Sequence, residues 1–390
     1  MKSYTYLIVG GGITAAYAVK GIREKDKNGS IGILTKEAFG PYNRPFLSKD
    51  LWKDKPVDSI WIPIEDENTE LLTNHQVVQL NIREKRVSTQ NKEEFGFQTL
   101  LLATGTEPKH LRFSDEDIIY FRTYSDYLKL SDLAEKQESF AIIGAGFIGS
   151  EIAAALSMKG KKVFLIDTGA GIGWRVFPQE IVEFLNSFYR SKGIEILDHV
   201  SIKDVEKQGN QHRIILKNGQ TMNVDGIVLG VGVKPNSQFA DKAGIFVEDG
   251  IKVNSYLETS APDIFAAGDV AAFHSPALDK TLRFEHNDNA KKMGIVAGLN
   301  MAGGNQEYDY LPMFYSDLFD VGYEAVGLID ARLDPIVVWK EEYKRGVIYY
   351  RKDNIIKGIV LWNEWGKVDI AREIIQKQKW IEEKDLQKLI

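Results

Sequence analysis

Short apolar runs alternate with glycine turns and amphipathic stretches over the first two thirds of the chain. Residues 4–9 form an apolar run that ends in glycines, and residues 13–23 carry apolar side chains at helical spacing with cations in the last turn. A second apolar run follows at residues 30–35. The order strand, turn, helix, strand returns at residues 140–166, with Gly160 suited to end its helix. This repetition predicts two nucleotide-binding folds.

The remaining pattern predicts further β structure and a distinct C-terminal part. Residues 76–89 alternate as a small β meander would, and residues 225–229 and 263–266 have the composition of short parallel strands. From about residue 310 the chain becomes rich in aromatic and β-branched runs, and a charged amphipathic helix from about residue 367 ends it. We expect this tail to form a separate α+β domain.

Length, charge and cysteine content narrow the functional classes. A chain of 390 residues suggests two or three domains, and scattered charges with a net charge of -6 make nucleic acid an unexpected partner. No run of about 18 apolar residues is present, so no membrane span is expected, and a strand that starts near Met1 favours a cytoplasmic protein. The chain has no cysteine, which excludes disulfides and cysteine nucleophiles, and its six scattered histidines without a His-Glu-x-x-His helix predict no metal site.

The first glycine turn fits the pattern G-x-G-x-x-A. In such a turn the first glycine permits the bend, the second lets the backbone approach a pyrophosphate, and the small third residue lets the helix pack on the strand. The six residues are Gly10, Gly11, Gly12, Ile13, Thr14 and Ala15. Glu37 is the candidate to bind a ribose, since its neighbour Lys36 cannot accept a hydroxyl hydrogen. A plain structural turn and a surface Lys–Glu pair are the alternatives.

The second glycine turn is a full G-x-G-x-x-G, formed by Gly144, Ala145, Gly146, Phe147, Ile148 and Gly149. Asp167 ends the next strand, where a carboxylate accepts hydrogen bonds from a ribose 2′-hydroxyl and repels a 2′-phosphate, which favours NADH over NADPH. Arg175 lies nearby and could instead serve a phosphate. Two such turns, each followed by an acid, indicate two dinucleotide sites.

Two small-residue turns follow predicted strands and offer backbone for a flat cofactor. They are Ala103-Thr104-Gly105 and Ala267-Gly268-Asp269. Asp269 could accept hydrogen bonds from a ribityl chain, although a turn with a helix-capping aspartate is the alternative.

Together these motifs resemble the flavoprotein reductases with two dinucleotide folds, the group of glutathione reductase, ferredoxin reductase and NADH oxidase. Residues 41–49, PYNRPFLSK, are similar to the ferredoxin reductase branch, and Pro41 and Phe46 stand where disulfide reductases carry their redox cysteines. Segments 77–80, 283–286, 313–318, 320–324 and 358–363 resemble apoptosis-inducing factor. The resemblance implies an α/β fold with an FAD-binding domain (1–112 and 245–309), an NAD(H)-binding domain (113–244) and a C-terminal α+β domain (310–390).

The resemblance also implies roles for individual residues. Arg44 and Arg122 match FAD-phosphate contacts and Val78 an adenine contact, while Lys49 matches a lysine beside the flavin N5 and Glu151 its ion-pair partner. The residues that match positions near the two reacting rings are His286 and Asn287 under the flavin, and Gly232, Glu285, Tyr315 and Glu324 on the nicotinamide side. Tyr315 replaces a tryptophan that is usual at this position. The alternative for Lys49 and Glu151 is an ion pair at the surface, and the alternative for Tyr315 is an aromatic residue of the core. The targeting region and C-terminal insertion of the animal protein have no counterpart, so its death-related role is not expected.

Three functions remain open from the sequence. The first is an FAD-dependent oxidoreductase that takes a hydride from NADH and passes electrons to a quinone, another small molecule or oxygen. The second is an NADH–ferredoxin or NADH–rubredoxin reductase. The third is an NADH-responsive binding protein whose redox state changes its dimerisation, which would involve a homodimer. The sequence does not name the electron acceptor.

Overall fold

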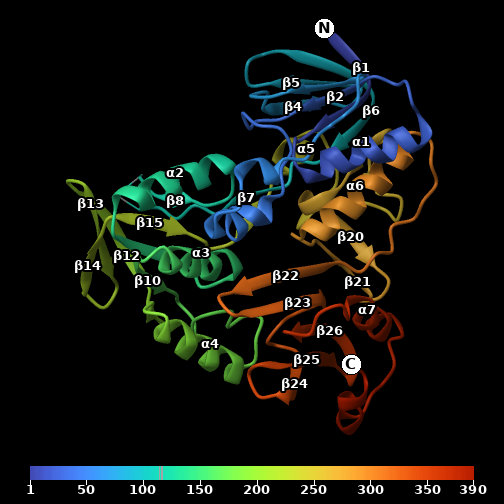
Figure 1. Cartoon of the computed structure of the whole chain (residues 1–390). Coiled ribbons are helices and arrows are strands. Elements are labelled where there is room, and N and C mark those ends of the chain that lie inside the picture. Colours follow the sequence, from blue (N-terminus) through green and yellow to red (C-terminus); the bar gives the residue numbers. More distant parts are fainter. Residues whose placement is uncertain (114, 116) are drawn as a thin grey trace. The chain divides into compact units, whose positions relative to one another are not determined.

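The computed structural model describes residues 1–113, 115 and 117–390. Its contacts divide the chain into two compact units, each assembled from three segments (Figure 1). The first unit contains residues 1–43, 58–107 and 234–314, and the second contains residues 44–57, 108–233 and 315–390. The domain boundaries expected from the sequence stay a prediction.

The first unit is built on a seven-stranded sheet with the order β3-β2-β1-β6-β5-β4, to which β19 adds beside β6. The parallel strands are β1 (Lys2–Val9), β2 (Ile31–Leu34), β3 (Thr69–Leu72), β6 (Glu94–Leu102) and β19 (Ile264–Ala266). The strands β4 (Val77–Asn81) and β5 (Arg86–Thr89) run antiparallel and confirm the predicted meander. Val9 pairs with both Leu34 and Leu102, so the turns after these strands share one edge of the sheet.

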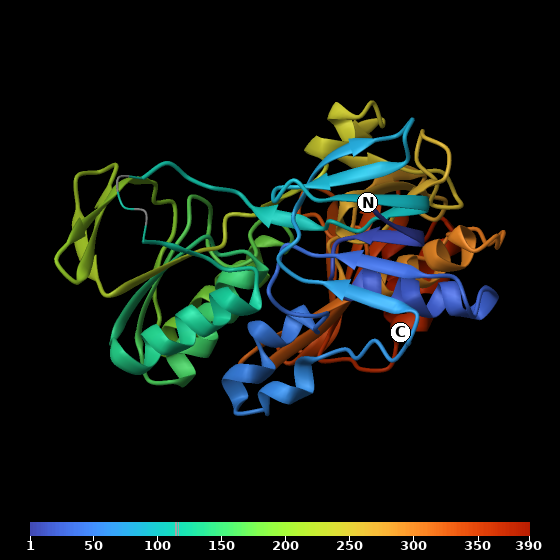
Figure 2. The same ribbon diagram turned by 90° about the horizontal axis from the view of Figure 1, so that it is seen from above.

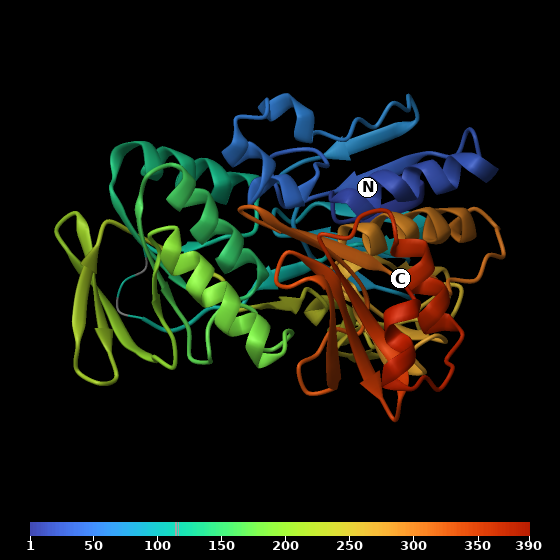
Figure 3. The ribbon, with the colours of Figure 1, turned by 60° about the horizontal axis from the view of Figure 1, so that its bottom comes forward.

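Two helices of the first unit, α1 (Ile13–Lys25) and α6 (Asn287–Met301), lie side by side (Figures 1 and 3). Glycines let their backbones approach closely. A Cβ atom on Gly21 would lie 2.1 Å from the carbonyl oxygen of Ile295, and one on Gly298 would lie 2.1 Å from that of Ala18. Any larger residue at either position would force the helices apart.

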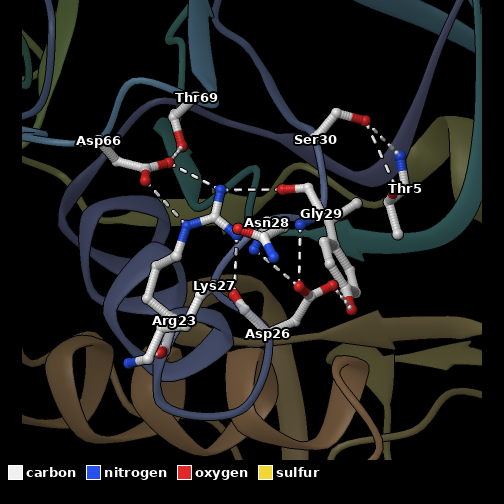
Figure 4. A network of polar contacts seen from close by, with 10 residues as sticks. Thr5, Arg23, Asp26, Lys27, Asn28, Gly29, Ser30, Asp66 and Thr69 are labelled. Atoms are coloured by element: carbon white, nitrogen blue, oxygen red, sulfur yellow. Dashed lines mark hydrogen bonds and ion pairs between the residues drawn. The ribbon is translucent and has the colours of Figure 1, made fainter.

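A network of polar contacts fixes the turn between α1 and β2 (Figure 4). The Arg23 guanidinium donates to both carboxylate oxygens of Asp66, at 2.9 and 2.8 Å, and to the carbonyl oxygens of Asp26 and Gly29. The Asp26 carboxylate accepts from the Gly29 backbone N–H and from the Tyr6 hydroxyl, each at 2.9 Å. The backbone N–H groups of Asn28 and Gly29 lower the pKa of Asp26, and the Arg23 guanidinium lowers the pKa of Asp66. The network sets where β2 begins, and therefore where Glu37 lies after it.

The rest of the first unit consists of short strands and one short helix. A four-stranded sheet has the order β17 (Val247–Glu248), β18 (Gly250–Lys252), β20 (Ala271–Ser275) and β21 (Lys280–Leu282). Its two outer pairings are antiparallel and the central pairing of β18 with β20 is parallel. The helix α5 spans Gln238–Lys242. The strands β7 (Thr106–Pro108) and β16 (Val233–Pro235) pair with each other.

The second unit contains the second nucleotide fold, a five-stranded parallel sheet with the order β11-β10-β9-β15-β8. Its strands are β8 (Ile119–Tyr120), β9 (Ser139–Ile143), β10 (Lys162–Ile166), β11 (Glu195–Leu197) and β15 (Gly226–Leu229). Its helices are α2 (Tyr124–Lys136), α3 (Phe147–Met158) and α4 (Gln179–Ser191). Ile143 pairs with Ile166 and Leu229, so the turns after β9, β10 and β15 also share an edge. The predicted repetition of the fold is confirmed.

A three-stranded antiparallel sheet in the second unit was not predicted. It consists of β12 (Ile202–Gln208), β13 (Gln211–Leu216) and β14 (Thr221–Val224), drawn yellow-green in Figure 2. Val205 and Ile214 of this sheet share one apolar cluster with Ala141 and Ile227 of the parallel sheet. The strand β12 has only two apolar residues, Ile202 and Val205, and their spacing of three does not give the alternation that predicts a strand.

The C-terminal tail forms a five-stranded sheet with the order β22-β23-β26-β25-β24. The strands are β22 (Met313–Leu318), β23 (Val321–Gly327), β24 (Asp334–Glu341), β25 (Arg345–Lys352) and β26 (Ile355–Trp362). The helix α7 (Val368–Gln376) packs on β23 and β26 (Figure 3), and a short 3-10 helix at Glu383–Lys388 follows it, so the chain does not end on α7. Within the part of the chain that the structure describes, no helix has the length and apolar character needed to cross a bilayer.

Candidate functional site

The first glycine turn joins β1 to α1 and combines tight packing with an open face. Gly10 has φ +116°, and a Cβ on it would lie 2.1 Å from the carbonyl oxygen of Ala103. A Cβ on Gly11 would lie 2.6 Å from the Thr35 side chain, whereas one on Gly12 would meet nothing within 4 Å. Gly12 caps α1 without a side-chain hydrogen bond, so the helix start at Ile13 presents its first N–H groups as an anion site does.

The two small-residue turns lie on the same sheet edge as this glycine turn. Gly268 has φ +76°, and a Cβ on it would lie 2.3 Å from the Thr14 hydroxyl oxygen. The Thr104 hydroxyl donates to the Asn236 carbonyl oxygen at 2.8 Å, and the Asn236 amide donates back to the Thr104 carbonyl oxygen at 2.9 Å. A Cβ atom on Gly105 would meet nothing within 4 Å. Asp269 lies in a 3-10 turn, and its backbone carbonyl oxygen accepts from the Arg283 guanidinium at 2.9 Å. The predicted residues Thr14, Ala15, Ala103 and Gly268 are therefore gathered with the glycine turn.

The residues predicted to contact the adenosine half of FAD differ in exposure and in their hydrogen bonds. Glu37 follows β2 as expected, and its carboxylate accepts from the Tyr42 hydroxyl at 2.7 Å. Lys36 is exposed, and Val78 is 48% exposed at a β-bulge of β4. These positions leave Glu37 and Val78 accessible to a nucleotide, and their roles stay predictions.

His286 and Asn287 lie at the start of α6, and each carries a buried polar atom. The His286 ring centroid lies 4.6 Å from that of Phe314 and 5.2 Å from that of Phe284. Among the described residues, nothing hydrogen-bonds the His286 Nδ1 or the Asn287 Oδ1 atom. A buried polar group left without a partner costs about 1–3 kcal/mol, so such atoms mark a place where a ligand completes the structure. Glu285 beside them is exposed and accepts from Arg283 at 2.7 Å. The arrangement in the first unit thus fits FAD.

The environment of His286 gives a stability prediction. Burial lowers the pKa of His286 to about 4, against the opposing charges of Asp269 and Asp288. The unfolded chain binds the proton near pH 6.5, so stability falls as the pH is lowered from about 6.5 to about 4, by roughly 2–3 kcal/mol. Replacing His286 by glutamine should remove this part of the acid sensitivity in urea unfolding at pH 7 and pH 4.5. His274→Gln, at a histidine with an exposed side chain, is the matched control, and equal acid sensitivity in all three proteins would contradict the assignment.

The second glycine turn repeats the geometry of the first. Gly144 has φ +101°, and a Cβ on it would lie 2.5 Å from the Gly230 carbonyl oxygen. A Cβ on Gly149 would lie 1.8 Å from the Gly144 carbonyl oxygen, so this position requires glycine for α3 to pack on its strand. Gly146 caps α3 without a side-chain hydrogen bond and faces open space. Phe147 and Ile148 start the helix there, which fits the pyrophosphate of NAD(H).

Asp167 follows β10 and reaches back to the second glycine turn. Its Oδ2 atom accepts from the Ala145 N–H at 2.7 Å, and its Oδ1 atom accepts from the Gly169 N–H at 2.7 Å and from the Trp174 indole at 3.0 Å. The Arg175 guanidinium lies over the Trp174 ring, 4.9 Å from its centroid. The acid therefore stands at the predicted place, while Trp174 was not foreseen.

Lys49 and Glu151 form a buried ion pair in the second unit. The Lys49 Nζ atom lies 2.7 Å from a Glu151 oxygen, and the two side chains are 7% and 3% exposed. Glu151 also accepts from the hydroxyls of Ser48 and Ser316, each at 2.6 Å. The alternative of a surface ion pair is wrong for these residues. With three donors on one carboxylate, the position of Lys49 is fixed.

Tyr315 and Glu324 lie on neighbouring strands of the tail sheet. The Lys49 Nζ atom lies 5.3 Å from the centroid of the Tyr315 ring, a cation–π contact, and burial raises the pKa of Tyr315 to about 12. Burial also raises the pKa of Glu324, and among the described residues its Oε2 atom has no hydrogen-bond partner. The protonated Tyr315 hydroxyl and the Glu324 Oε2 atom could each form a hydrogen bond with a polar ligand.

The other predicted contacts of the second unit lie in loops. Arg44 begins a 3-10 helix (η1, Arg44–Leu47) and donates to the Arg122 carbonyl oxygen at 2.8 Å, so the two arginines are neighbours. Gly232 is exposed with φ +95°, and its carbonyl oxygen accepts from the Lys109 N–H at 2.9 Å. The structure thus brings together Arg44 with Arg122, and Lys49 with Glu151 and Tyr315.

Sequence reasoning missed the residues that orient the predicted ones. Ser48 precedes Lys49 in the PYNRPFLSK segment, so its place beside the ion pair could have been inferred. Ser316 and Asn236 reach their partners only through the fold and leave no local pattern. Within the described residues, no group of three or more histidines, aspartates and glutamates could hold a metal ion.

Comparison with protein families gives two matches along the chain. The model of the pyridine nucleotide-disulphide oxidoreductase family matches residues 4–294. The model of the C-terminal domain of mitochondrion-associated apoptosis-inducing factor matches residues 297–341 and 339–377. The first match includes both glycine turns, and the second covers most of the tail sheet and α7.

Individual proteins resemble the chain over most of its length. Mitochondrial apoptosis-inducing factor 1 of Dictyostelium discoideum is 30% identical, over 98% of this chain and 80% of that protein. Monodehydroascorbate reductase 3 of Arabidopsis thaliana is 29% identical, over 84% of this chain and 81% of that protein. Among solved structures, the covalent putidaredoxin reductase–putidaredoxin complex has a chain that is 25% identical with a TM-score of 0.91, covering 99% of this chain and 97% of that one.

Proposed function

Because the chain belongs to the pyridine nucleotide-disulphide oxidoreductase family, we propose that it carries electrons from NADH to an acceptor that is not a disulfide. The chain is a flavin-dependent oxidoreductase whose cofactors are FAD and NAD(H). When bound, FAD supplies the chemistry that accepts a hydride and releases electrons singly or in pairs. The acceptor we favour is a quinone, another small molecule or oxygen.

The absence of cysteine carries this proposal. Reduction of a disulfide substrate by an enzyme thiol requires a cysteine, and the chain contains none. In its place the segment after Pro41 leads to Lys49, whose ammonium is buried against Glu151. A fixed buried charge at this point supports direct electron delivery to an acceptor without a thiol relay.

Each polar residue in the proposal has a defined task. Lys49 would supply a positive charge beside the flavin when FAD is bound, and a preorganised charge in a site shielded from water lowers the barrier to forming negative charge there. Glu151 holds Lys49 in place, and Ser48 and Ser316 hold Glu151. Tyr315 keeps its proton, because its pKa is raised to about 12, and contributes an aromatic face next to the ammonium.

A small redox protein is the second candidate acceptor. The similar reductase in the putidaredoxin complex works with such a partner, and this chain matches nearly the whole of it. Similarity to monodehydroascorbate reductase favours a small molecule instead. The redox-switched, dimerising protein is the third candidate.

A panel of acceptors tests the proposal. We expect NADH oxidation by the purified protein to accelerate at least about tenfold with a soluble quinone, and to remain unchanged with glutathione disulfide. Cytochrome c reduction that requires added ferredoxin would favour the protein acceptor. Slow turnover with every acceptor, a lasting long-wavelength absorbance band and an NADH-dependent change in mass would contradict the enzyme and favour the switch.

A further inference from the structure

The carboxylate of Asp167 is almost fully occupied by donors of its own chain. Each carboxylate oxygen can accept about two hydrogen bonds. Oδ1 accepts from the Gly169 N–H and from the Trp174 indole, and Oδ2 accepts from the Ala145 N–H. One acceptor position of Oδ2 therefore remains for a ligand. The carboxylate can bind a ribose hydroxyl with this oxygen only, and its orientation is set by the protein.

Trp174 is held in place by close packing on Gly169. A Cβ atom on Gly169 would lie 2.1 Å from the Trp174 Cε2 atom, so the indole rests directly on the backbone of the loop. The Gly169 carbonyl oxygen accepts from the His199 N–H at 2.8 Å, which ties this loop to the residues after β11. The Trp174 residue remains 36% exposed. The indole thus has a fixed face beside the ribose-binding acid and an open one.

The same indole determines where Arg175 lies. An arginine after this strand is the group that accommodates the 2′-phosphate of NADPH. In this chain the Arg175 guanidinium lies over the Trp174 ring, 4.9 Å from its centroid. The cation–π contact holds the guanidinium over the indole, and we expect this contact to compete with binding of a phosphate by Arg175.

We propose that Trp174 sets the preference for a dinucleotide with a free 2′-hydroxyl over one with a 2′-phosphate. It does so in two ways. Its N–H orients the Asp167 carboxylate toward the ribose, and its ring retains Arg175. Trp174 is a positioning residue, and the inference rests on the proposed function, in which NADH is the electron donor.

The test measures binding of NAD⁺ and NADP⁺ to the FAD-loaded protein by calorimetry. Trp174→Phe removes the indole N–H but keeps a ring, and should weaken NAD⁺ binding about three- to tenfold, because the Asp167 carboxylate loses the donor that orients it toward the ribose. Trp174→Ala also releases Arg175, and should lower the ratio of NAD⁺ to NADP⁺ affinity by about tenfold or more. Trp380→Phe, at an exposed tryptophan of the tail, is the matched control and should leave both affinities unchanged.

Variants of Arg175 distinguish the proposed role of Trp174 from a purely structural role. Arg175→Ala alone should leave the affinity ratio within about twofold of the wild type, since the guanidinium is held over the Trp174 ring. In the Trp174→Ala background the same change should weaken NADP⁺ binding again and restore the ratio in part. An unchanged ratio in Trp174→Ala, or a loss of NADP⁺ binding in Arg175→Ala alone, would overturn the inference.

Failure of the inference and failure of the proposed function give different results. If NADH does not reduce the flavin of the wild-type protein, the proposed function fails, whatever the binding ratios are. If NADH reduces it and Asp167→Ala loses its preference for NAD⁺, but the Trp174 variants keep theirs, then only the role of Trp174 is wrong.

Discussion

Replacing Lys49 by alanine should slow the reduction of the flavin by NADH about a hundredfold, while FAD stays bound. The Lys49 ammonium is 2.7 Å from Glu151 and nearly inaccessible to water, so it acts as a preorganised charge in a shielded site. Removing one such electrostatic contact from an active site typically costs about 10²–10³ in rate. Anaerobic stopped-flow absorbance measures this rate directly, and a rate equal to that of the wild type would remove Lys49 from the mechanism.

The stability of the Lys49 variant must be separated from its rate. Removing the lysine leaves a buried carboxylate without its cation, which typically destabilises a protein by about 3–5 kcal/mol. The double variant Lys49→Met with Glu151→Gln removes both charges and should recover most of that stability. Its flavin reduction should remain slow. If the rate recovers together with the stability, Lys49 is structural only. Lys159→Ala, in the exposed pair with Asp54, is the control and should change neither.

Alanine at Gly149 should greatly lower stability and alanine at Gly146 should hardly change it, whereas both should weaken NADH binding. Gly149 has no room, because its Cβ would lie 1.8 Å from the Gly144 carbonyl oxygen, and we expect a loss of about 3 kcal/mol or more. Gly146 has φ -76° and open space around a Cβ, so Gly146→Ala should change stability by less than about 1 kcal/mol. The added methyl group would nevertheless occupy the space of a pyrophosphate.

Urea unfolding and calorimetric titration with NAD⁺ check this pair of variants. Gly146→Ala should unfold like the wild type and bind NAD⁺ about a hundredfold more weakly. Gly149→Ala should fail in both measurements. Wild-type affinity in Gly146→Ala would show that the turn before α3 is not a phosphate site.

The sequence predicted the elements whose pattern is local. The strands β1, β2, β9 and β10 and the helices α1 and α3 follow directly from apolar runs and glycine turns, because a parallel strand buried on both faces reads as a continuous apolar stretch. The helix α6 escaped prediction because both of its sides are packed. Its backbone lies against α1 through Gly294 and Gly298, and such glycines carry meaning only once the partner helix is known.

The same distinction holds within the candidate site. Gly10, Gly144, Gly149 and Asp167 could be assigned from spacing, because a turn and the end of the next strand lie close together in every fold of this kind. The contact of Ser316 with Glu151 joins residues far apart in the chain and has no counterpart in the local pattern. The indole of Trp174 was invisible for a related reason, since only the folded loop directs its N–H toward Asp167.

Anaerobic titration of the purified protein with NADH is the most direct test that the chain is an NADH-dependent flavoprotein. We expect a yellow protein that contains stoichiometric FAD and loses its flavin absorbance on addition of an equivalent amount of NADH. A protein that is colourless, and stays colourless after incubation with excess FAD, would contradict it.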